Sequence, residues 1–463
     1  MQLTRRWPPK GLSKAEIFAA LGGALDENID YARSLVIGFP GTTPADISIE
    51  AFEMFLKSHP NNITTHTSGE GEKGFGGTQA LERDAISMVA DLLGAEAIDG
   101  YITPGGTESN IMGVLLGREY LAQRTGDQDS PCVILTSMFA HYSIRKAAWV
   151  LGLNRDEWGS CRFCSDRLDD DKHEEIRHFY RGHRVDLLGT DAVGRISVEQ
   201  LKARAAFHYS RGVKKFIVVV SEGNIMTGAV DNTRQVGEAI TQMRAEMEGA
   251  EFFLHVDACY GGFVVPFLGE FSSNFSFHVP EVDSVAIDAH KMGEVPYPGG
   301  MFIYREDERK LRSLLGVTMG YVPGETDGTL CGSRPGASAA ACYATFMRRG
   351  FVGYQEIVHR CMETADYLAK RLGEMDRIEV LPHDLNIVAF RLADDRPEVV
   401  KSPKFSGDFR ERVKLVSHHY PADFSDPNGH VRMLYKATVM SHVTEERVDD
   451  FIVALQEELE HMR

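Results

Sequence analysis

Four groups of residues in this chain have types and positions that suit chemistry, and the first contains a lysine. The apolar run 284–287 is followed by Asp288, Ala289, His290 and Lys291. Ligands of open α/β sheets bind where the strands end. A lysine there can be partly desolvated, which lowers the pKa of its amine and makes it a nucleophile toward aldehydes. The alternative is a lysine whose stem lies along the surface with its charge in water.

A carboxylate closes a second apolar run. Asp257 follows residues 252–256 and precedes Ala258, Cys259 and a pair of glycines. A carboxylate buried at a strand end requires a cationic partner. A protonated pyridine nitrogen would be such a partner, and pyridoxal phosphate sites use this pairing.

The other two groups are a glycine-rich turn and a histidine. Residues 103–110 read Thr-Pro-Gly-Gly-Thr-Glu-Ser-Asn and lead into a predicted apolar helix at 111–121. Such a turn presents backbone N–H groups to an anion such as a phosphate, although glycine pairs are also common in ordinary turns. His141 follows the apolar run 132–136 and could stack on a flat ring, although a lone histidine more often has a structural role. Together the four groups supply an amine, an acid, a phosphate cradle and a stacking ring.

The elements that position these residues alternate between strands and helices. Five short, nearly continuous apolar runs predict parallel strands buried on both faces, at 132–136, 216–220, 252–256, 284–287 and 301–304. Amphipathic helices are predicted between them, one at 233–247 and one that begins with the capping-box pattern Ser197 to Gln200. This alternation predicts an α/β fold with a mostly parallel central sheet.

The chain has 463 residues, more than one hydrophobic core usually serves, so we expect more than one domain. We expect an N-terminal segment at 1–55, a large domain at 56–325 and a smaller α+β domain at 326–463. The smaller domain has predicted helices at 336–348, 354–372 and 444–463 and strands near 385–392 and 431–439. Residues 154–183 interrupt the alternation, and we interpret them as a surface insertion.

The insertion contains a pattern that resembles a zinc site: Cys161, Cys164, His173 and His178. The spacing between the second cysteine and the first histidine is shorter than in the usual zinc finger. We therefore predict an insertion without a metal.

Composition limits the partners. The net charge is −17, which argues against binding nucleic acid or an anionic membrane surface. No apolar run is long enough to span a membrane, no signal peptide is visible, and the seven cysteines do not suggest a disulfide scaffold. We expect a soluble, cytoplasmic protein that acts on a small molecule.

The motifs in combination resemble the group II pyridoxal-phosphate-dependent amino-acid decarboxylases, which have the fold-type-I architecture of the aspartate-aminotransferase superfamily. The resemblance covers roughly residues 60–455 and is greatest to the archaeal-type L-tyrosine/L-aspartate decarboxylases. The segments that carry it are 105–110, 141–148, 255–258, 290–293, 298–300, 385–389 and 432–452.

This resemblance implies a cofactor, pyridoxal 5'-phosphate, and a role for each motif residue. Lys291 would bind the cofactor aldehyde, Asp257 would pair with the pyridine nitrogen and His141 would stack on the ring. The phosphate would be held by Gly106, Thr107 and His290.

Three further roles follow from the resemblance. Ser333 would reach the phosphate of the other subunit in a homodimer. Tyr321 would lie on a mobile loop and return a proton to Cα; the alternative is a tyrosine that packs at the dimer interface. Arg432 is a candidate for binding the substrate carboxylate; the alternative is a surface salt bridge.

A second family shares this fold and cofactor. Cys259 and the segment 332–336 resemble sphingosine-1-phosphate lyases, which cleave a Cα–Cβ bond and release an aldehyde. The segment 223–225, Gly-Asn-Ile, differs from the Gly-Thr-Thr of many decarboxylases, so aromatic, acidic and phosphorylated substrates all stay open. A catalytically silent binding protein is a third alternative, against which Lys291 and Asp257 argue.

Overall fold

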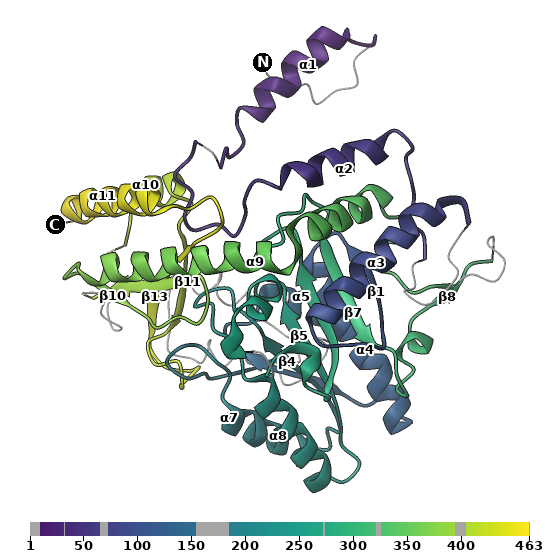
Figure 1. Cartoon of the computed structure of the whole chain (residues 1–463). Helices are drawn as coiled ribbons and strands as arrows, with labels where there is room; N and C mark the ends of the chain where they lie inside the picture. Colours follow the sequence, from purple (N-terminus) through teal and green to yellow (C-terminus); the bar gives the residue numbers. More distant parts are fainter. Residues whose placement is uncertain are drawn as a thin grey trace.

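The centre of the protein is a seven-stranded sheet (Figure 1). The structure is a computed structural model that describes residues 10–31, 33–64, 73–153, 185–271, 274–320, 326–393 and 404–462. The strand order is β1-β7-β6-β5-β4-β2-β3. The strands are β1 (Ile98–Thr103), β2 (Cys132–Ser137), β3 (Val185–Leu188), β4 (Lys215–Ser221), β5 (Glu251–Ala258), β6 (Val282–Asp288) and β7 (Gly300–Arg305).

The five predicted strands all form, but the direction predicted for one of them is wrong. Strands β2 to β6 pair in parallel, whereas β7 is antiparallel to both β6 and β1. The chain between β6 and β7 covers only residues 289–299 and contains no helix. A parallel neighbour requires a crossover connection of a dozen or more residues, so this short connection returns the chain in the opposite direction.

Both faces of the sheet are buried, as the apolar runs predict. Along β4 the side chains of Phe216, Val218 and Val220 belong to one hydrophobic cluster, and those of Ile217 and Val219 to another. Helices α4 (Gly106–Thr125) and α5 (Tyr142–Val150) contribute to the second cluster. The first cluster includes residues of α3 (Gly76–Leu92), α7 (Val198–Tyr209) and α8 (Thr233–Glu246).

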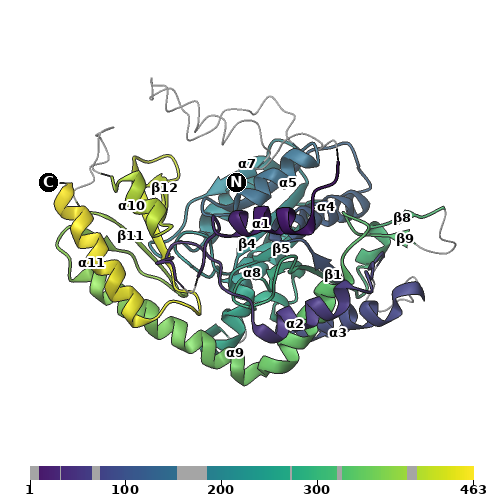
Figure 2. The same cartoon turned by 90° about the horizontal axis from the view of Figure 1, so that it is seen from above.

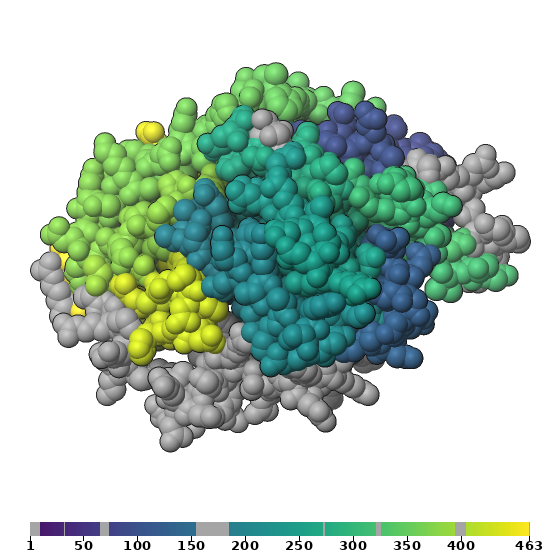
Figure 3. Space-filling model, turned by 90° about the horizontal axis from the view of Figure 1, so that it is seen from below, coloured from purple at the N-terminus to yellow at the C-terminus, as the bar shows by residue number. Residues whose placement is uncertain are grey.

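A second, four-stranded sheet is formed by the C-terminal part, and this confirms the α/β class with a smaller additional sheet. Its order is β10-β11-β13-β12, with β10 (Ile378–Val380), β11 (Ile387–Leu392), β12 (Val416–Pro421) and β13 (Val431–Thr438). Figure 2 shows it beside the large sheet, with α11 (Glu445–His461) on its outer side. In Figure 3 the green and yellow C-terminal residues lie directly against the teal part of the chain. The domain boundaries at 55/56 and 325/326 stay predictions.

One long helix, α9 (Gly336–Gly373), runs along both sheets (Figure 2). Gly350 has φ 60° and ψ −179°, which interrupts the helical backbone and explains why the sequence predicts two helices here. Helix α2 (Asp46–Leu56) lies beside α9 in Figure 1. The other α-helices of the described residues are α1 (Lys14–Leu25) and α10 (Gly407–Arg412). Strands β8 (Val317–Thr318) and β9 (Thr326–Asp327) form a separate pair on either side of residues 321–325.

Candidate active site

Lys291 lies just beyond the carboxyl end of β6, as predicted. Its Nζ is 3.0 Å from Oδ2 of Asp288, the last residue of that strand. Burial by itself lowers the pKa of Lys291, but the Asp288 carboxylate outweighs it, so the pKa is raised above its ordinary value. The predicted lowering is therefore wrong for the free protein, because the partner carboxylate stands three residues before the lysine. The ion pair holds the amine at the strand end.

Asp257 is the second-to-last residue of the neighbouring strand β5 and is 7% exposed. Its Oδ2 accepts a hydrogen bond of 3.0 Å from Asn110 Nδ2, and its Oδ1 accepts one of 3.2 Å from the backbone N–H of Cys259. Among the described residues, no lysine or arginine forms an ion pair with this carboxylate. A buried carboxylate held by neutral donors alone is a good partner for a cationic ring nitrogen.

Asn110 connects this carboxylate to His141. The Asn110 amide donates to Ser143 Oγ at 2.8 Å, and Ser143 Oγ lies 2.7 Å from His141 Nδ1. Asn110 Oδ1 lies 2.8 Å from His255 Nε2, so that imidazole carries its proton on Nε2. The sequence analysis included Asn110 in a motif but gave it no role. In the structure it fixes the positions of an acid and a ring at once.

Both imidazoles in this network are neutral near pH 7. Burial lowers the pKa of His141 to about 4, and the nearby ammonium groups of Lys291 and Lys436 contribute in the same direction. Burial likewise lowers the pKa of His255 to about 4. A neutral, orientated imidazole at the start of α5 can stack on a flat ring without adding charge.

The glycine-rich turn forms the first turn of α4, which begins at Gly106 rather than near residue 111. A Cβ at position 106 would lie 2.2 Å from Cys259 Sγ and 2.8 Å from Asp288 Oδ2. Only glycine therefore lets this helix start so close to the ends of β5 and β6. The start of a long helix directs backbone N–H groups and positive potential toward an anion, and Thr107 follows directly.

His290 lies beside the same turn. Its Nε2 is 3.6 Å from Asp288 Oδ2, its ring centroid is 4.0 Å from that of Tyr297, and a Cβ at Gly105 would lie 3.4 Å from its Cε1. Its Nδ1 and Asp288 Oδ1 are buried and have no hydrogen-bond partner in the described part of the chain.

Ser333 accepts a 3.1 Å hydrogen bond from Asn61 and lines a small cavity with Pro104, next to the glycine-rich turn.

Lys436, which the sequence analysis missed, is the second buried amine of this region. It lies on β13 and is 5% exposed. No carboxylate of the described residues forms an ion pair with it. Burial lowers its pKa to about 7, and the nearby Lys291 ammonium contributes. The signal that could have found it is a single charge within the apolar run 433–440.

Arg432 is not brought to this cluster. Its guanidinium donates to Glu379 Oε2 at 3.0 Å and to the Leu392 carbonyl at 2.7 Å, within the small sheet. This is the salt bridge that the sequence analysis gave as the alternative to substrate binding.

Two predicted groups cannot be placed. Tyr321 and the insertion residues Cys161, Cys164, His173 and His178 lie outside the described residues. Within the described ranges, no cluster of His, Cys, Asp and Glu side chains is arranged to hold a metal ion. No helix in those ranges is long and apolar enough to cross a membrane.

The comparisons with known proteins agree on one family. Residues 77–393 match the model of the pyridoxal-dependent decarboxylase conserved domain. A probable L-tyrosine/L-aspartate decarboxylase of Methanosarcina mazei is 31% identical over 440 residues, 89% of this chain and 95% of the relative. The L-aspartate decarboxylase of Thermococcus kodakarensis is 28% identical over 457 residues, 97% of this chain and 98% of the relative.

Solved structures show the same fold. L-methionine decarboxylase from Streptomyces sp. 590 has a TM-score of 0.78 at 22% identity and covers 99% of this chain and 98% of its own. The sphingosine-1-phosphate lyase of Burkholderia pseudomallei has a TM-score of 0.74 at 20% identity, covering 100% of this chain and 94% of its own.

The chain belongs to the pyridoxal-dependent decarboxylases. It is a carboxy-lyase, and its cofactor is pyridoxal 5'-phosphate. The site fits this cofactor: within the described ranges Asp257 has no cationic partner and His290 has a buried ring nitrogen without a hydrogen-bond partner, and Gly106 leaves room at the helix start.

Proposed function

We propose that this protein decarboxylates an L-amino acid to the amine and CO₂, and that the substrate is acidic, such as aspartate or glutamate, or aromatic, such as tyrosine. The substrate class rests on the names of the relatives, which are L-aspartate, L-aspartate/L-glutamate and L-tyrosine/L-aspartate decarboxylases. The observation that carries the chemistry is the grouping of the Lys291 amine, the Asp257 carboxylate and the His141 ring at the ends of β5, β6 and the start of α5.

Each side chain of this group has one task. Pyridoxal 5'-phosphate supplies an aldehyde that binds amines and a ring that accepts the electron pair of the broken bond. Lys291 is the amine that binds the aldehyde, and Asp257 holds a proton on the ring nitrogen. Neutral His141 supports one face of the ring. Gly106, Thr107 and His290 hold the phosphate, which fixes the ring relative to the substrate.

Lys436 is our candidate for binding the α-carboxylate of the substrate, in place of Arg432. A buried ammonium without a carboxylate partner is costly for the folded protein, so such a group is expected to meet an anion when the site is filled. Its ammonium contributes to the lowered pKa of His141, and the Lys291 ammonium contributes to its own lowered pKa, so it lies near both residues. Arg432 already has two partners within the small sheet.

Replacing Lys436 tests this role. Lys436→Met removes the charge but keeps the length of the side chain, and kcat/KM should fall about 100-fold, as expected when a buried charge loses its partner. In the wild type, kcat/KM should decrease as the pH rises through about 7, because the ammonium loses its proton. Lys436→Arg keeps the charge and should move this decrease to a much higher pH.

The measurement is kcat/KM as a function of pH for the three proteins. Arg432→Met is the matched control and should change kcat/KM little. A Lys436→Met enzyme with the wild-type pH profile would assign the carboxylate to another residue.

Tyr321 is our candidate for the proton donor to Cα. A phenol is neutral near pH 7 and can act as an acid, and a loop that closes over the substrate excludes water. Tyr321→Phe should still release CO₂ but lose most amine formation, because Cα is not reprotonated; oxygen would then convert part of the substrate to an aldehyde. The test is the ratio of amine to CO₂, with and without oxygen. An unchanged ratio would assign the proton to another residue, with His141 the next to test.

We also propose a cytoplasmic homodimer in which Ser333 of each subunit reaches the phosphate held by the other. Large apolar side chains are exposed on three helices that lie on the outside of the molecule in Figure 1. They are Phe18, Leu21 and Leu25 of α1, Met54 and Leu56 of α2, and Met347, Phe351 and Val352 of α9. A second copy of the chain would cover them.

The substrate is identified by a screen of the common L-amino acids for CO₂ release by the cofactor-loaded enzyme. We expect release from aspartate, glutamate or tyrosine. The competing function is that of an aldehyde lyase. It is favoured by Cys259, which lies beside Gly106 of the glycine-rich turn and is one of the residues that resemble the sphingosine-1-phosphate lyases. A long-chain phosphorylated amino alcohol should then give an aldehyde, and no amino acid should release CO₂.

A further inference from the structure

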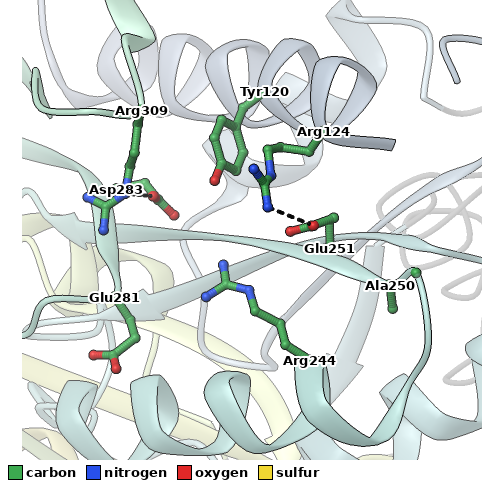
Figure 4. Close-up of a pocket in the computed structure, with 9 residues that line it drawn as sticks. Tyr120, Arg124, Arg244, Ala250, Glu251, Glu281, Asp283 and Arg309 are labelled. Atoms are coloured by element: carbon green, nitrogen blue, oxygen red, sulfur yellow. Dashed lines mark hydrogen bonds and ion pairs between the residues drawn. The ribbon is translucent and has the colours of Figure 1, made fainter. Parts of the chain in front are cut away.

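A second hollow lies at the opposite edge of the seven-stranded sheet, at the amino ends of β5 and β6 (Figure 4). It has a volume of about 400 Å³. The ends of α4 and α8, the starts of both strands and Arg309 line it. Asp283, at the start of β6, lines the hollow, whereas Lys291 follows the other end of the strand. With a rise of about 3.3 Å per residue, the two sites are separated by roughly 15–20 Å.

Most of the charges in this hollow already have partners. Arg124 Nη2 lies 3.2 Å from Glu251 Oε1, and Arg309 Nε lies 3.3 Å from Asp283 Oδ1. Figure 4 shows these two ion pairs on the walls of the hollow. Glu281 accepts a 3.2 Å hydrogen bond from the Thr241 hydroxyl.

Two donors remain. Arg244 donates one hydrogen bond, of 2.6 Å, to the Phe252 carbonyl; its Nε is buried without a hydrogen-bond partner, and no carboxylate of the described residues pairs with it. Tyr120 is 8% exposed, and its hydroxyl has no hydrogen-bond partner in the described part of the chain. In Figure 4 the guanidinium and the hydroxyl point into the same space. Burial and the Asp283 carboxylate raise the pKa of Tyr120, so its hydroxyl keeps its proton at neutral pH.

A guanidinium and a hydroxyl that face one space recognise a carboxylate. The three lining carboxylates, Glu251, Glu281 and Asp283, balance the three lining arginines. A simple anion would therefore be attracted by Arg244 but repelled by the lining carboxylates. A cationic group beside the anion would be attracted by those carboxylates. We propose that this hollow is a second binding site, distinct from the active site, for a small zwitterion of the α-amino-acid type. Its carboxylate binds Arg244 and Tyr120, and its ammonium faces the carboxylates.

The test uses cofactor-loaded enzyme reduced with borohydride, so that the active site no longer turns over amino acids. Titration calorimetry with L-alanine and L-aspartate should show saturable binding, with a Kd on the order of 1 mM for a site of a few hydrogen bonds. Arg244→Gln should weaken binding about tenfold or more, and Tyr120→Phe, which keeps the packing of the ring, by about threefold. Arg348→Gln, at an exposed arginine of α9, is the matched control and should bind as the wild type does.

Inorganic phosphate and methylamine are the single-charge probes, and both should bind more weakly than the amino acids. The proposal is overturned if no amino acid binds, if Arg244→Gln and Tyr120→Phe bind as the wild type does, or if phosphate binds more tightly than the amino acids. Unchanged turnover in Tyr120→Phe, measured on unreduced enzyme, separates this site from the active site. The binding test does not depend on which amino acid the active site decarboxylates.

Discussion

Lys291→Ala should abolish turnover, with a loss of at least about 10⁴-fold, because the amine that binds the cofactor aldehyde is removed. Reduction with borohydride should fix the cofactor to the wild-type chain on the peptide that contains Lys291, and no longer to the variant. Mass spectrometry of the digested protein identifies the peptide that carries the cofactor. The prediction fails if the variant keeps near wild-type activity or if another lysine carries the cofactor.

Two further variants separate the chemistry of Lys291 from its structural role. Lys291→Ala also leaves the buried carboxylate of Asp288 without its 3.0 Å ion pair, which could destabilise the site. Lys291→Arg retains a cation for Asp288 but has no nucleophilic amine, so it should fold as the wild type does and still be inactive. Lys370→Ala, at an exposed lysine of α9, should change neither the folding nor the activity of the enzyme.

Asp257→Asn should lower kcat by at least about 100-fold, equivalent to roughly 2.7 kcal/mol of barrier, because a neutral amide no longer holds the proton on the ring nitrogen. The hydrogen bond from Asn110 to position 257 can persist in this variant, since an amide oxygen also accepts. The loss should therefore lie in kcat while the cofactor stays bound.

Two readouts accompany the rate. The absorption spectrum of the bound cofactor should change with the protonation of its ring, and the thermal stability should stay close to that of the wild type. Asp257→Glu keeps the charge and should retain more activity than Asp257→Asn. A loss of less than about tenfold in Asp257→Asn, which is roughly 1.4 kcal/mol, would remove Asp257 from the role of ring-nitrogen partner.

Local patterns were sufficient to predict much of the fold. Continuous apolar runs predicted β2, β4, β5, β6 and β7, and capping and periodicity predicted α7 and α8. Strand β1 was missed because its sequence contains Asp99 and Gly100, and a buried carboxylate does not resemble a strand residue. In the structure Asp99 is paired with Arg312 and Tyr304, which are more than two hundred residues away in the sequence. Such compensation between distant residues is not visible in a local pattern.

The same limit applies to the site. Lys291, Asp257, His141 and Gly106 could be found because each stands at the end of an apolar run or in a distinctive turn. Lys436 carries a weaker signal, a single charge within an apolar run, and that signal does not show that the residue lies near Lys291, which belongs to a distant part of the sequence. For Arg432 the sequence left substrate binding and a salt bridge as alternatives, and only the structure shows its hydrogen bonds to Glu379 and Leu392.

The central claim is that this site breaks the bond between Cα and the carboxylate of an amino acid. The most direct measurement is a product balance with the amino acid that reacts fastest in the screen. That amino acid is labelled with carbon-13 at its α-carboxylate. We predict one labelled CO₂ and one amine for each amino acid consumed, with no aldehyde formed in the absence of oxygen. An aldehyde released without labelled CO₂ would contradict the account, because it would show that the Cα–Cβ bond is the one broken.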